Sequence, residues 1–227
     1  MRKFFVISTA VALMVVLFFS YTLKISARNS DHYALATQLY DGSVNIVSAI
    51  YLDFRLYDTL FELLIFSVAI TGVSFYARRV RKSGEILAER SPLIEFELLV
   101  LGFFAALWGI YTTLTGHLQP GGAFSGGAIG ASGIVMLTFA VGSKKIHLLS
   151  EKLELEKLEN TVIFIFLAYV FFANVKGGFF YPGFGTGEIG SFFSGRGALL
   201  LNSTIGFKVF VGGWIIFYEF SKRKESI

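Results

Sequence analysis

The stretch from residue 96 to residue 141, FELLVLGFFAALWGIYTTLTGHLQPGGAFSGGAIGASGIVMLTFAV, decides the fold class of this chain. It holds two apolar runs, 96–115 and 122–141. Each has about the 20 residues that a helix needs to cross a bilayer. The Pro-Gly-Gly sequence at 120–122 between them predicts a tight reversal of the chain. The stretch therefore predicts a membrane-spanning helical hairpin.

The composition of the whole chain agrees with a membrane location. The 227 residues are 54% hydrophobic, include 26 Phe and have a mean hydropathy of +0.65. Soluble domains are roughly 45–50% apolar even when Gly is counted. The chain has no Cys, which excludes disulfides, Cys-ligated metals and thiol nucleophiles. We therefore expect an all-α, polytopic membrane protein.

Four further apolar runs bring the expected number of transmembrane helices to about six. They are 4–23, 57–77, 161–175 and 199–220. The first run follows two basic residues, so a signal peptide is an alternative. Its length and the lack of an Ala-x-Ala site after it favour an uncleaved anchor.

The distribution of Lys and Arg predicts the orientation. The N-terminus, the second and fourth loops and the C-terminus together carry 14 basic residues, and the loops on the other side carry 5. Basic residues accumulate on the cytoplasmic side of membrane proteins. Both termini are therefore expected to be cytoplasmic.

The charged stretches suggest two modules. A two-span module, 1–80, is joined by a basic cytoplasmic linker, 81–92, to a four-span module, 93–227. A second charged stretch, SEKLELEKLEN at 150–160, has the Glu/Lys spacing of a solvated helix face, with no active site expected there. In the long first loop, apolar residues recur at helical spacing over 40–54. This pattern predicts an amphipathic helix on the outer surface or against a neighbour.

Acidic residues at the start of the second span are the first candidate for ion translocation. Asp58 and Glu62 are four residues apart and share one helix face, and Asp53 and Arg55 come just before them. An ionisable group inside a membrane needs a partner or a task. Glu62 is thus a candidate to bind a proton or Na⁺, and a structural pair with Arg55 or another subunit is the alternative.

Two basic or titratable residues complete the candidate ion site. Lys208 lies near the middle of the last span, where it could relay protons or serve as a fixed counter-charge for Glu62 or for an acid on a partner. His117 ends the third span at the outer surface, and either a proton relay or a hydrogen-bonded anchor fits it.

The loop after His117 and the helix that follows it are candidates for a structural role. The turn holds Pro120 and Gly121, and the Gly122, Gly126 and Gly130 spacing of four residues suits close helix packing.

Two motifs resemble those of Mrp-type multisubunit Na⁺/H⁺ antiporters. The segment NIVSAIYLDFRLYDTLFELLIFSVAITGV at 45–73 is similar to the C-terminal segment of the large A subunit. The stretch GHLQPGGAFSGGAIGA at 116–131, with the later LLNSTIGFKV, resembles the B subunit, MnhB. Ala123 replaces a Gly of that pattern, and Phe61 stands where the A subunit has Gly. A fusion of both modules in one chain is similar to archaeal complex I-related hydrogenase and sulfane sulfur reductase complexes.

The resemblance implies a membrane subunit that contributes to cation or proton translocation within such a respiratory complex. It places Glu62 in an ion path and His117, Pro120, Phe124 and Lys208 at matching B-subunit positions. The alternatives are a structural subunit that seals the complex, a subunit of a stand-alone antiporter, and a self-sufficient membrane enzyme or small channel.

The same resemblance implies the partners, the cellular location and the cofactors of this chain. The expected partners are other membrane subunits and the bilayer of a prokaryotic, archaeal cell membrane, with no nucleic acid. No cofactor or metal is expected in this chain, which would be non-catalytic by itself, and the transported ion would be Na⁺ or H⁺.

Overall fold

The computed structural model describes residues 7–8, 10–15, 18, 42–79, 91–175, 189–193 and 197–221 of the chain. Within those ranges the chain is helical and has no strand. The predicted linker at 81–92 lies outside the described residues except for its last two positions, and the first predicted span, 4–23, is described only at 7–8, 10–15 and 18. The helices are α3 (Ile46–Ala49), η2 (Ile50–Phe54), α4 (Leu56–Arg79), α5 (Pro92–Leu114), α6 (Ala123–Val141), α7 (Ser143–Lys152), α8 (Leu155–Val175) and α9 (Ala198–Ser221).

Four of the described helices are long and apolar enough to cross a membrane. They are α4, α5, α6 and α9. The expectation of an all-α, polytopic membrane protein is thereby confirmed. The predicted span at 161–175 is also helical, as part of α8, but α8 is not among these four. The total number of spans and the orientation stay predictions.

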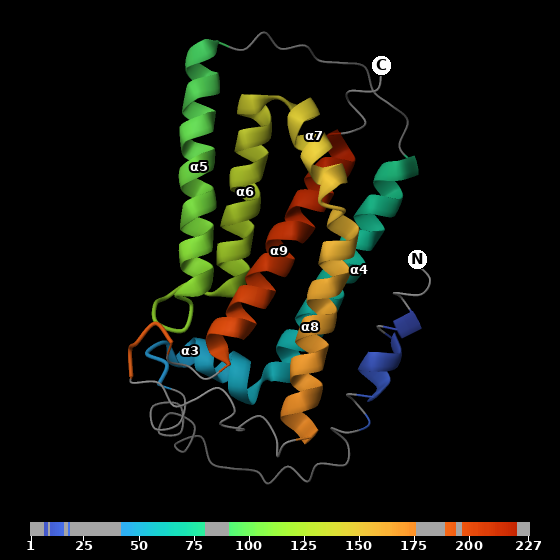
Figure 1. Cartoon of the computed structure of the whole chain (residues 1–227), viewed down its shortest axis with the longest axis vertical. Coiled ribbons are helices and arrows are strands. Elements are labelled where there is room, and N and C mark those ends of the chain that lie inside the picture. The colour runs from blue at the N-terminus through green and yellow to red at the C-terminus, as the bar shows by residue number, and fades with distance from the viewer. Residues whose placement is uncertain are drawn as a thin grey trace.

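Helix α9 is the central element of the bundle. It crosses between the α5–α6 hairpin on one side and helices α4 and α8 on the other (Figure 1). In the most apolar 18-residue segment of each helix, 56% of the residues of α9 are buried, whereas only 11% of those of α5 are buried. Since α5 presents most of its apolar side chains outward, it has the character of a lipid- or protein-facing helix.

Glycines allow the α5–α6 hairpin to pack closely. A Cβ atom added to Gly109 would lie 2.6 Å from the carbonyl oxygen of Gly126, and one added to Gly133 would lie 2.8 Å from the backbone nitrogen of Ala106. Gly127 of α6 faces α9 in the same way, since its Cβ would lie 2.4 Å from the carbonyl oxygen of Gly206. Helix α6 thus uses small residues toward two neighbours, as close membrane helices do.

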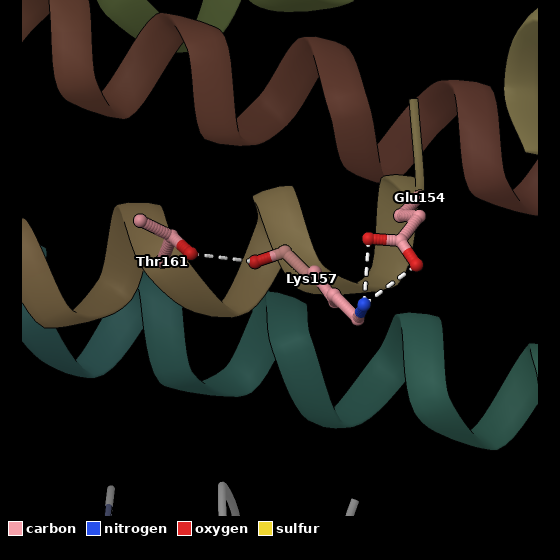
Figure 2. A network of polar contacts seen from close by, with 3 residues as sticks. All are labelled: Glu154, Lys157 and Thr161. Carbon is pink, nitrogen blue, oxygen red and sulfur yellow. Dashed lines mark hydrogen bonds and ion pairs between the residues drawn. The ribbon is translucent and has the colours of Figure 1, made fainter. Parts of the chain in front are cut away.

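The fourth loop folds back into the bundle instead of staying in solvent. Helix α7 ends at Lys152, and α8 begins at Leu155 after a break in which Glu154 has a φ of +48°. At the start of α8, the ammonium of Lys157 contacts both carboxylate oxygens of Glu154 at 2.6 Å, and the Thr161 hydroxyl donates to the Lys157 carbonyl (Figure 2). Leu155 is buried directly after the break.

The helical prediction for the first loop also holds, with two of its apolar side chains turned outward. Val44 and Val47 are 53% and 70% exposed, whereas Ser48 is fully buried. Helices α3 and η2 lie across one end of the bundle (Figure 1), and they bury Ala49 and Leu52 together with Ser48 while Val47 stays exposed. This arrangement suits a segment that lies at a membrane surface or against another subunit.

Candidate functional site

Three motifs that are far apart in the sequence meet at the end of the bundle where α3 lies (Figure 1). Asn45 makes the first connection, because its side-chain nitrogen donates to the carbonyls of Gly116 and Gln119, both at 2.8 Å. Its side-chain oxygen accepts from the Ser48 N–H, and its own backbone N–H donates to the His117 carbonyl at 3.0 Å. One residue thus caps α3 and fixes the α5–α6 loop.

Asn202 of α9 completes this region, which we call the outer junction and define by Asn45, Ser48, Tyr51, His117 and Asn202. The Tyr51 hydroxyl donates to the Asn202 side-chain oxygen at 2.9 Å and accepts from the Ser48 hydroxyl at 3.1 Å. The Asn202 side-chain nitrogen donates to Ser48 at 3.3 Å. Ser48, His117 and Asn202 are all fully buried, and the hydrogen bonds that connect Ser48, Tyr51 and Asn202 join uncharged side chains.

The environment of Tyr51 keeps its hydroxyl protonated. Burial raises the pKa of Tyr51 above its ordinary value of 10.0, and the negative charge of Glu62 adds a smaller increase. The hydrogen bond with Ser48 and one from the Ala123 backbone act in the opposite direction. A protonated Tyr51 can keep donating to Asn202 over the physiological pH range.

His117 is placed as part of this network. Its Nε2 atom lies 3.1 Å from the carbonyl oxygen of Phe192, which only accepts, so this nitrogen carries the proton. The ring also packs edge-on against Phe192, with centroids 6.5 Å apart. These contacts suit the anchor that was one alternative for His117. The relay role stays a prediction.

The predicted turn and packing residues lie next to the junction. Gly121 and Gly122 have φ values of +140° and +112°, which L side chains rarely adopt. A Cβ at Gly122 would lie 2.8 Å from the Tyr51 hydroxyl oxygen, so the turn also leaves room for that side chain. Pro120 is exposed, and Phe124 packs against the main apolar core.

The acidic side chains of the second span that the structure describes, Asp58 and Glu62, lie on the surface of this chain. Arg55 and Asp58 make an ion pair of 2.6 Å on the exposed surface, where their side chains are 65% and 54% exposed. Asp53 belongs to η2, and the placement of its side chain lies outside the described residues. Glu62 is exposed on α4, while Leu60 and Leu63 on either side of it are buried. Its carboxylate therefore faces out of this chain and not toward the core.

Two of the buried charged side chains in the described part of the chain form a pair between α8 and α9, and Glu219 of α9 is buried as well. Lys208 is fully buried, and its ammonium forms an ion pair with the Glu159 carboxylate, whose side chain is 10% exposed. Lys208 was predicted to be a proton relay or a fixed counter-charge for a buried acid, with Glu62 or an acid on a partner as the suggested acid, and in the structure the paired acid is Glu159. The relay role stays a prediction. The prediction of a solvated face for 150–160 is wrong at Glu159, which turns inward to pair with Lys208.

A signal for Glu159 was present in the sequence. Val162, Ile163 and Phe166 follow Glu159 at helical spacing, and all three are buried. A stripe at i, i+3, i+4 and i+7 places Glu159 on the inner face of α8. The charged residues next to it concealed this stripe, because they extended the pattern of a solvated helix beyond the residues that follow it.

These observations define the chain as a polytopic α-helical membrane protein with a neutral junction at one end and an internal charge pair. The described residues contain no group of three or more His, Cys, Asp or Glu that could hold a metal ion. A family model for a domain related to the MnhB subunit of the Na⁺/H⁺ antiporter matches residues 94–215. The match spans more than half of the chain, and the chain belongs to this family.

Two further comparisons support the family and the fold. An uncharacterized protein of Methanocaldococcus jannaschii is 34% identical over 133 residues, which are 51% of this chain and 50% of that protein. The chain thus aligns with about half the length of this relative. A chain in the structure of the membrane-bound sulfane sulfur reductase, an archaeal respiratory membrane complex, has the same fold, with a TM-score of 0.69 and 22% identity. That match covers 94% of this chain and 97% of the other.

Proposed function

We propose that this chain is a membrane subunit of a multisubunit, Mnh-type assembly that moves cations or protons, and that Glu62 lines an ion path shared with another subunit. The membership of the MnhB-related family supports the type of assembly. The exposure of Glu62 on a membrane-spanning helix is the observation that carries the shared path.

The position of Glu62 calls for a second chain. It comes six residues after the start of α4, which is about 9 Å along the helix axis. The exposed residues that follow it along α4 are apolar, with Ile65 and Val68 being 68% and 72% exposed. A carboxylate that faced lipid there would cost a few kcal/mol, so it needs a partner or a water-lined path. Since this face belongs to the surface of the chain, another membrane subunit must supply the other wall.

The other predicted ion residues have distinct places in this proposal. The Arg55–Asp58 pair lies at the start of α4, one turn before Glu62, where it can set the local field. Its exposure leaves it able to exchange partners, and exposed pairs of this kind contribute little to stability. Gly122 of the turn lies next to the Tyr51 hydroxyl of the junction. The charge of Glu62 raises the pKa of Tyr51, so the junction and Glu62 are electrostatically linked.

The structural comparison favours a respiratory assembly. The similar chain belongs to an archaeal respiratory membrane complex, and the fold is shared over almost the whole of both chains. In such an assembly, redox centres would lie in other subunits, and this chain would be non-catalytic, with H⁺ or Na⁺ as the transported ion. A stand-alone Mrp-type antiporter is the second arrangement that the family allows.

Substitution of Glu62 tests the proposal directly. Glu62→Gln removes the charge while keeping the size, and Glu97→Gln on the exposed surface of α5 is a matched control. We expect the Glu62→Gln assembly to form normally but to lose most of its ion translocation in inverted membrane vesicles, measured with a pH-sensitive dye and varied Na⁺. Intact transport would overturn the role of Glu62, and failed assembly would favour a structural subunit.

Purification through a tag on this chain tests the assembly itself. We expect larger antiporter-like membrane subunits to co-purify in mild detergent. Additional iron–sulfur proteins would place the chain in a respiratory complex, and antiporter subunits alone would indicate the stand-alone form. If the chain emerges alone or as a small oligomer of itself, the subunit proposal is wrong.

A further inference from the structure

We propose that the Glu159–Lys208 pair is a proton-loading site, and that an acidic pocket at the α7–α8 break is its water-filled entrance. This inference goes beyond the proposed function, since it concerns a different part of the molecule from Glu62. It rests on three observations, which are the buried pair, the acidic pocket and the thin apolar layer between them.

The pair is the first observation. Lys208 lies ten residues after the start of α9, about 15 Å along the axis, so its charge is deep in the bundle. Its side chain is fully buried and that of Glu159 is 10% exposed. Buried ion pairs recover their desolvation cost only in part, so they are weak evidence for a purely stabilising role.

The pocket is the second observation. It has a volume of about 330 Å³ and lies where α7, α8 and α9 come together. Its lining residues are Ser150, Glu151, Glu154, Leu155, Glu156, Lys157, Ile215, Tyr218 and Glu219. Four carboxylates thus face one ammonium, which is itself held by Glu154 (Figure 2). A concave surface with this excess of negative charge concentrates cations, including hydronium.

The layer between pocket and pair is the third observation. Leu155 and Ile215 line the inner end of the pocket and are 6% and 4% exposed. Glu159 comes four residues after Leu155, about 6 Å deeper along α8. Val211 and Trp214 pack in the same apolar cluster as Leu155 and Ile215. The acidic pocket and the buried pair are therefore separated by roughly one layer of side chains.

The indole of Trp214 gives this layer a polar point. Trp214 is 4% exposed, and its N–H finds no hydrogen-bond acceptor among the described residues. A buried donor without an acceptor is unfavourable, and a transient water that crosses the layer would satisfy it. The layer is thus suited to brief hydration.

The chemistry of the pair favours a proton over a metal cation. The Lys208 ammonium repels any cation that approaches Glu159, and Na⁺ would have to lose its hydration shell to cross the apolar layer. A proton needs only a short chain of water. In the loading step, hydronium in the pocket gives up one proton and becomes water. The proton passes along the chain of water to the Glu159 carboxylate, which becomes a neutral carboxylic acid. Lys208 keeps its own proton and loses its counter-charge.

The groups around the pair include one other buried acid in the described part of the chain, Glu219, which is 8% exposed and lines the pocket. The buried polar side chains that α4 and α6 contribute in the described part of the chain are the hydroxyls of Thr59, Ser74 and Thr138. On α7, α8 and α9, the charged or titratable groups on the pocket side are Glu151, Glu154, Glu156, Lys157, Tyr218 and Glu219. These belong to the entrance, so Glu159 is the acceptor nearest to Lys208.

Infrared spectroscopy of the full chain, in the assembly purified with it and placed in lipid nanodiscs, tests the loading step. We expect a protonated-carboxyl band that grows as pH falls, is lost in Glu159→Gln and is kept in the control Glu97→Gln, which lies on the exposed surface of α5 and outside the pocket. Leu155→Ser hydrates the apolar layer and should speed hydrogen–deuterium exchange of this band by about tenfold or more. A titrating band that is unchanged in Glu159→Gln, or its absence in the parent protein, would overturn the loading site.

Cysteine accessibility tests the entrance, because the chain has no native Cys. Ile215→Cys and Ile163→Cys form a matched pair, since both parent side chains are 4% exposed but Ile215 alone lines the pocket. Methanethiosulfonates that carry a trimethylammonium or a sulfonate group are added to membrane vesicles that contain the assembly. We expect Ile215→Cys to react with the cationic reagent about tenfold faster than with the anionic one, and Ile163→Cys to react slowly with both.

Protection of Ile215→Cys equal to that of Ile163→Cys, or a preference for the anionic reagent, would contradict the entrance. This measurement does not require the Glu159 variant to fold. It is also independent of Glu62. A negative result would therefore contradict the entrance but not the proposed function, and a positive result would not support the role of Glu62.

Discussion

Helix α9 carries two polar sites of opposite character. Asn202, near its start, belongs to a neutral junction in which Ser48 and Tyr51 exchange hydrogen bonds with it. Lys208, six residues later and about 9 Å along the axis, belongs to a charged pair with Glu159. Both side chains are fully buried. One helix therefore holds a tie that ordinary pH leaves unchanged and a pair that one proton can alter.

Under the proposed function, this difference would separate the contacts that hold the chain together from the group that takes part in ion chemistry. The neutral junction joins α3 and η2 of the predicted two-span module to the α5–α6 turn and α9 of the predicted four-span module. Hydrogen bonds between neutral groups fix a geometry without an uncompensated charge. The charged pair lies where a change of protonation alters the field inside the membrane, which is a property that translocation requires.

The largest expected effect comes from removing one member of the charged pair. Lys208→Met leaves the Glu159 carboxylate buried without its counter-charge and should lower the free energy of unfolding by about 3–5 kcal/mol. The double variant with Glu159→Gln should recover most of this loss, since the uncompensated charge is removed. The measurement is the fraction of folded protein after heating, from fluorescence-detected size exclusion in detergent.

Lys157→Met is the matched control for this prediction. Lys157 also pairs with a glutamate, Glu154 in the break before α8, but the Lys157 side chain is 43% exposed, so the loss should be below about 1 kcal/mol (Figure 2). An equal effect at Lys157 and Lys208, or a double variant as unstable as Lys208→Met alone, would remove the distinction between the buried pair and an ordinary surface pair.

A second prediction addresses the stretch of α9 between its two polar sites. Gly127→Ala places a Cβ 2.4 Å from the carbonyl oxygen of Gly206, a backbone atom that cannot rotate away. Helices α6 and α9 must separate, so we expect a loss of about 1–3 kcal/mol. Gly72→Ala is the control, because nothing lies within 4 Å of its Cβ. Thermal unfolding in detergent compares them, and equal stability of both variants would show that this contact has room.

The sequence predicted the fold class but not the partners of the charges. Length, hydropathy and the Pro-Gly-Gly turn at 120–122 were sufficient for the helical hairpin, because a bilayer imposes helices of fixed length on any apolar run. The small residues of α6 also pointed to close packing. These features are local, so they can be deduced from one segment of the chain at a time.

The Glu159–Lys208 pair joins residues 49 positions apart, and no local pattern specifies it. Glu159 was hidden among Glu and Lys residues with the spacing of a solvated helix, and Glu62 was named as a possible partner of Lys208 because both lay within predicted spans. The hydrogen bonds of Asn45 and Asn202 were missed for the same reason. A short polar side chain in a loop or helix end has several possible partners, and tertiary packing alone selects one.

A third prediction measures how strongly the neutral junction couples its two sides. Tyr51→Phe removes the hydroxyl that donates to Asn202, and Asn202→Ala removes the acceptor. We expect a coupling energy of about 0.5–1.5 kcal/mol in the double-mutant cycle, the net value of one buried neutral hydrogen bond. A cycle with Tyr51→Phe and Lys208→Met should be close to additive. Coupling of equal size in both cycles would mean that the two sites of α9 act as one.

The smallest expected effect is a pH dependence that belongs to the junction alone. Burial, and to a lesser extent the charge of Glu62, raise the pKa of Tyr51 above its ordinary value of 10.0. The unfolded chain therefore loses this proton first, so the stability that Tyr51 contributes is complete below pH 10.0 and falls as the pH rises through the folded-state value. The melting temperature of the parent protein should fall more steeply above that pH than that of Tyr51→Phe. Glu62→Gln should make the fall smaller and end it at lower pH, because it lowers the folded-state pKa of Tyr51 while the fall still begins at the unfolded-state value of 10.0. Parallel melting curves for the parent and Tyr51→Phe would show that the junction is open to water.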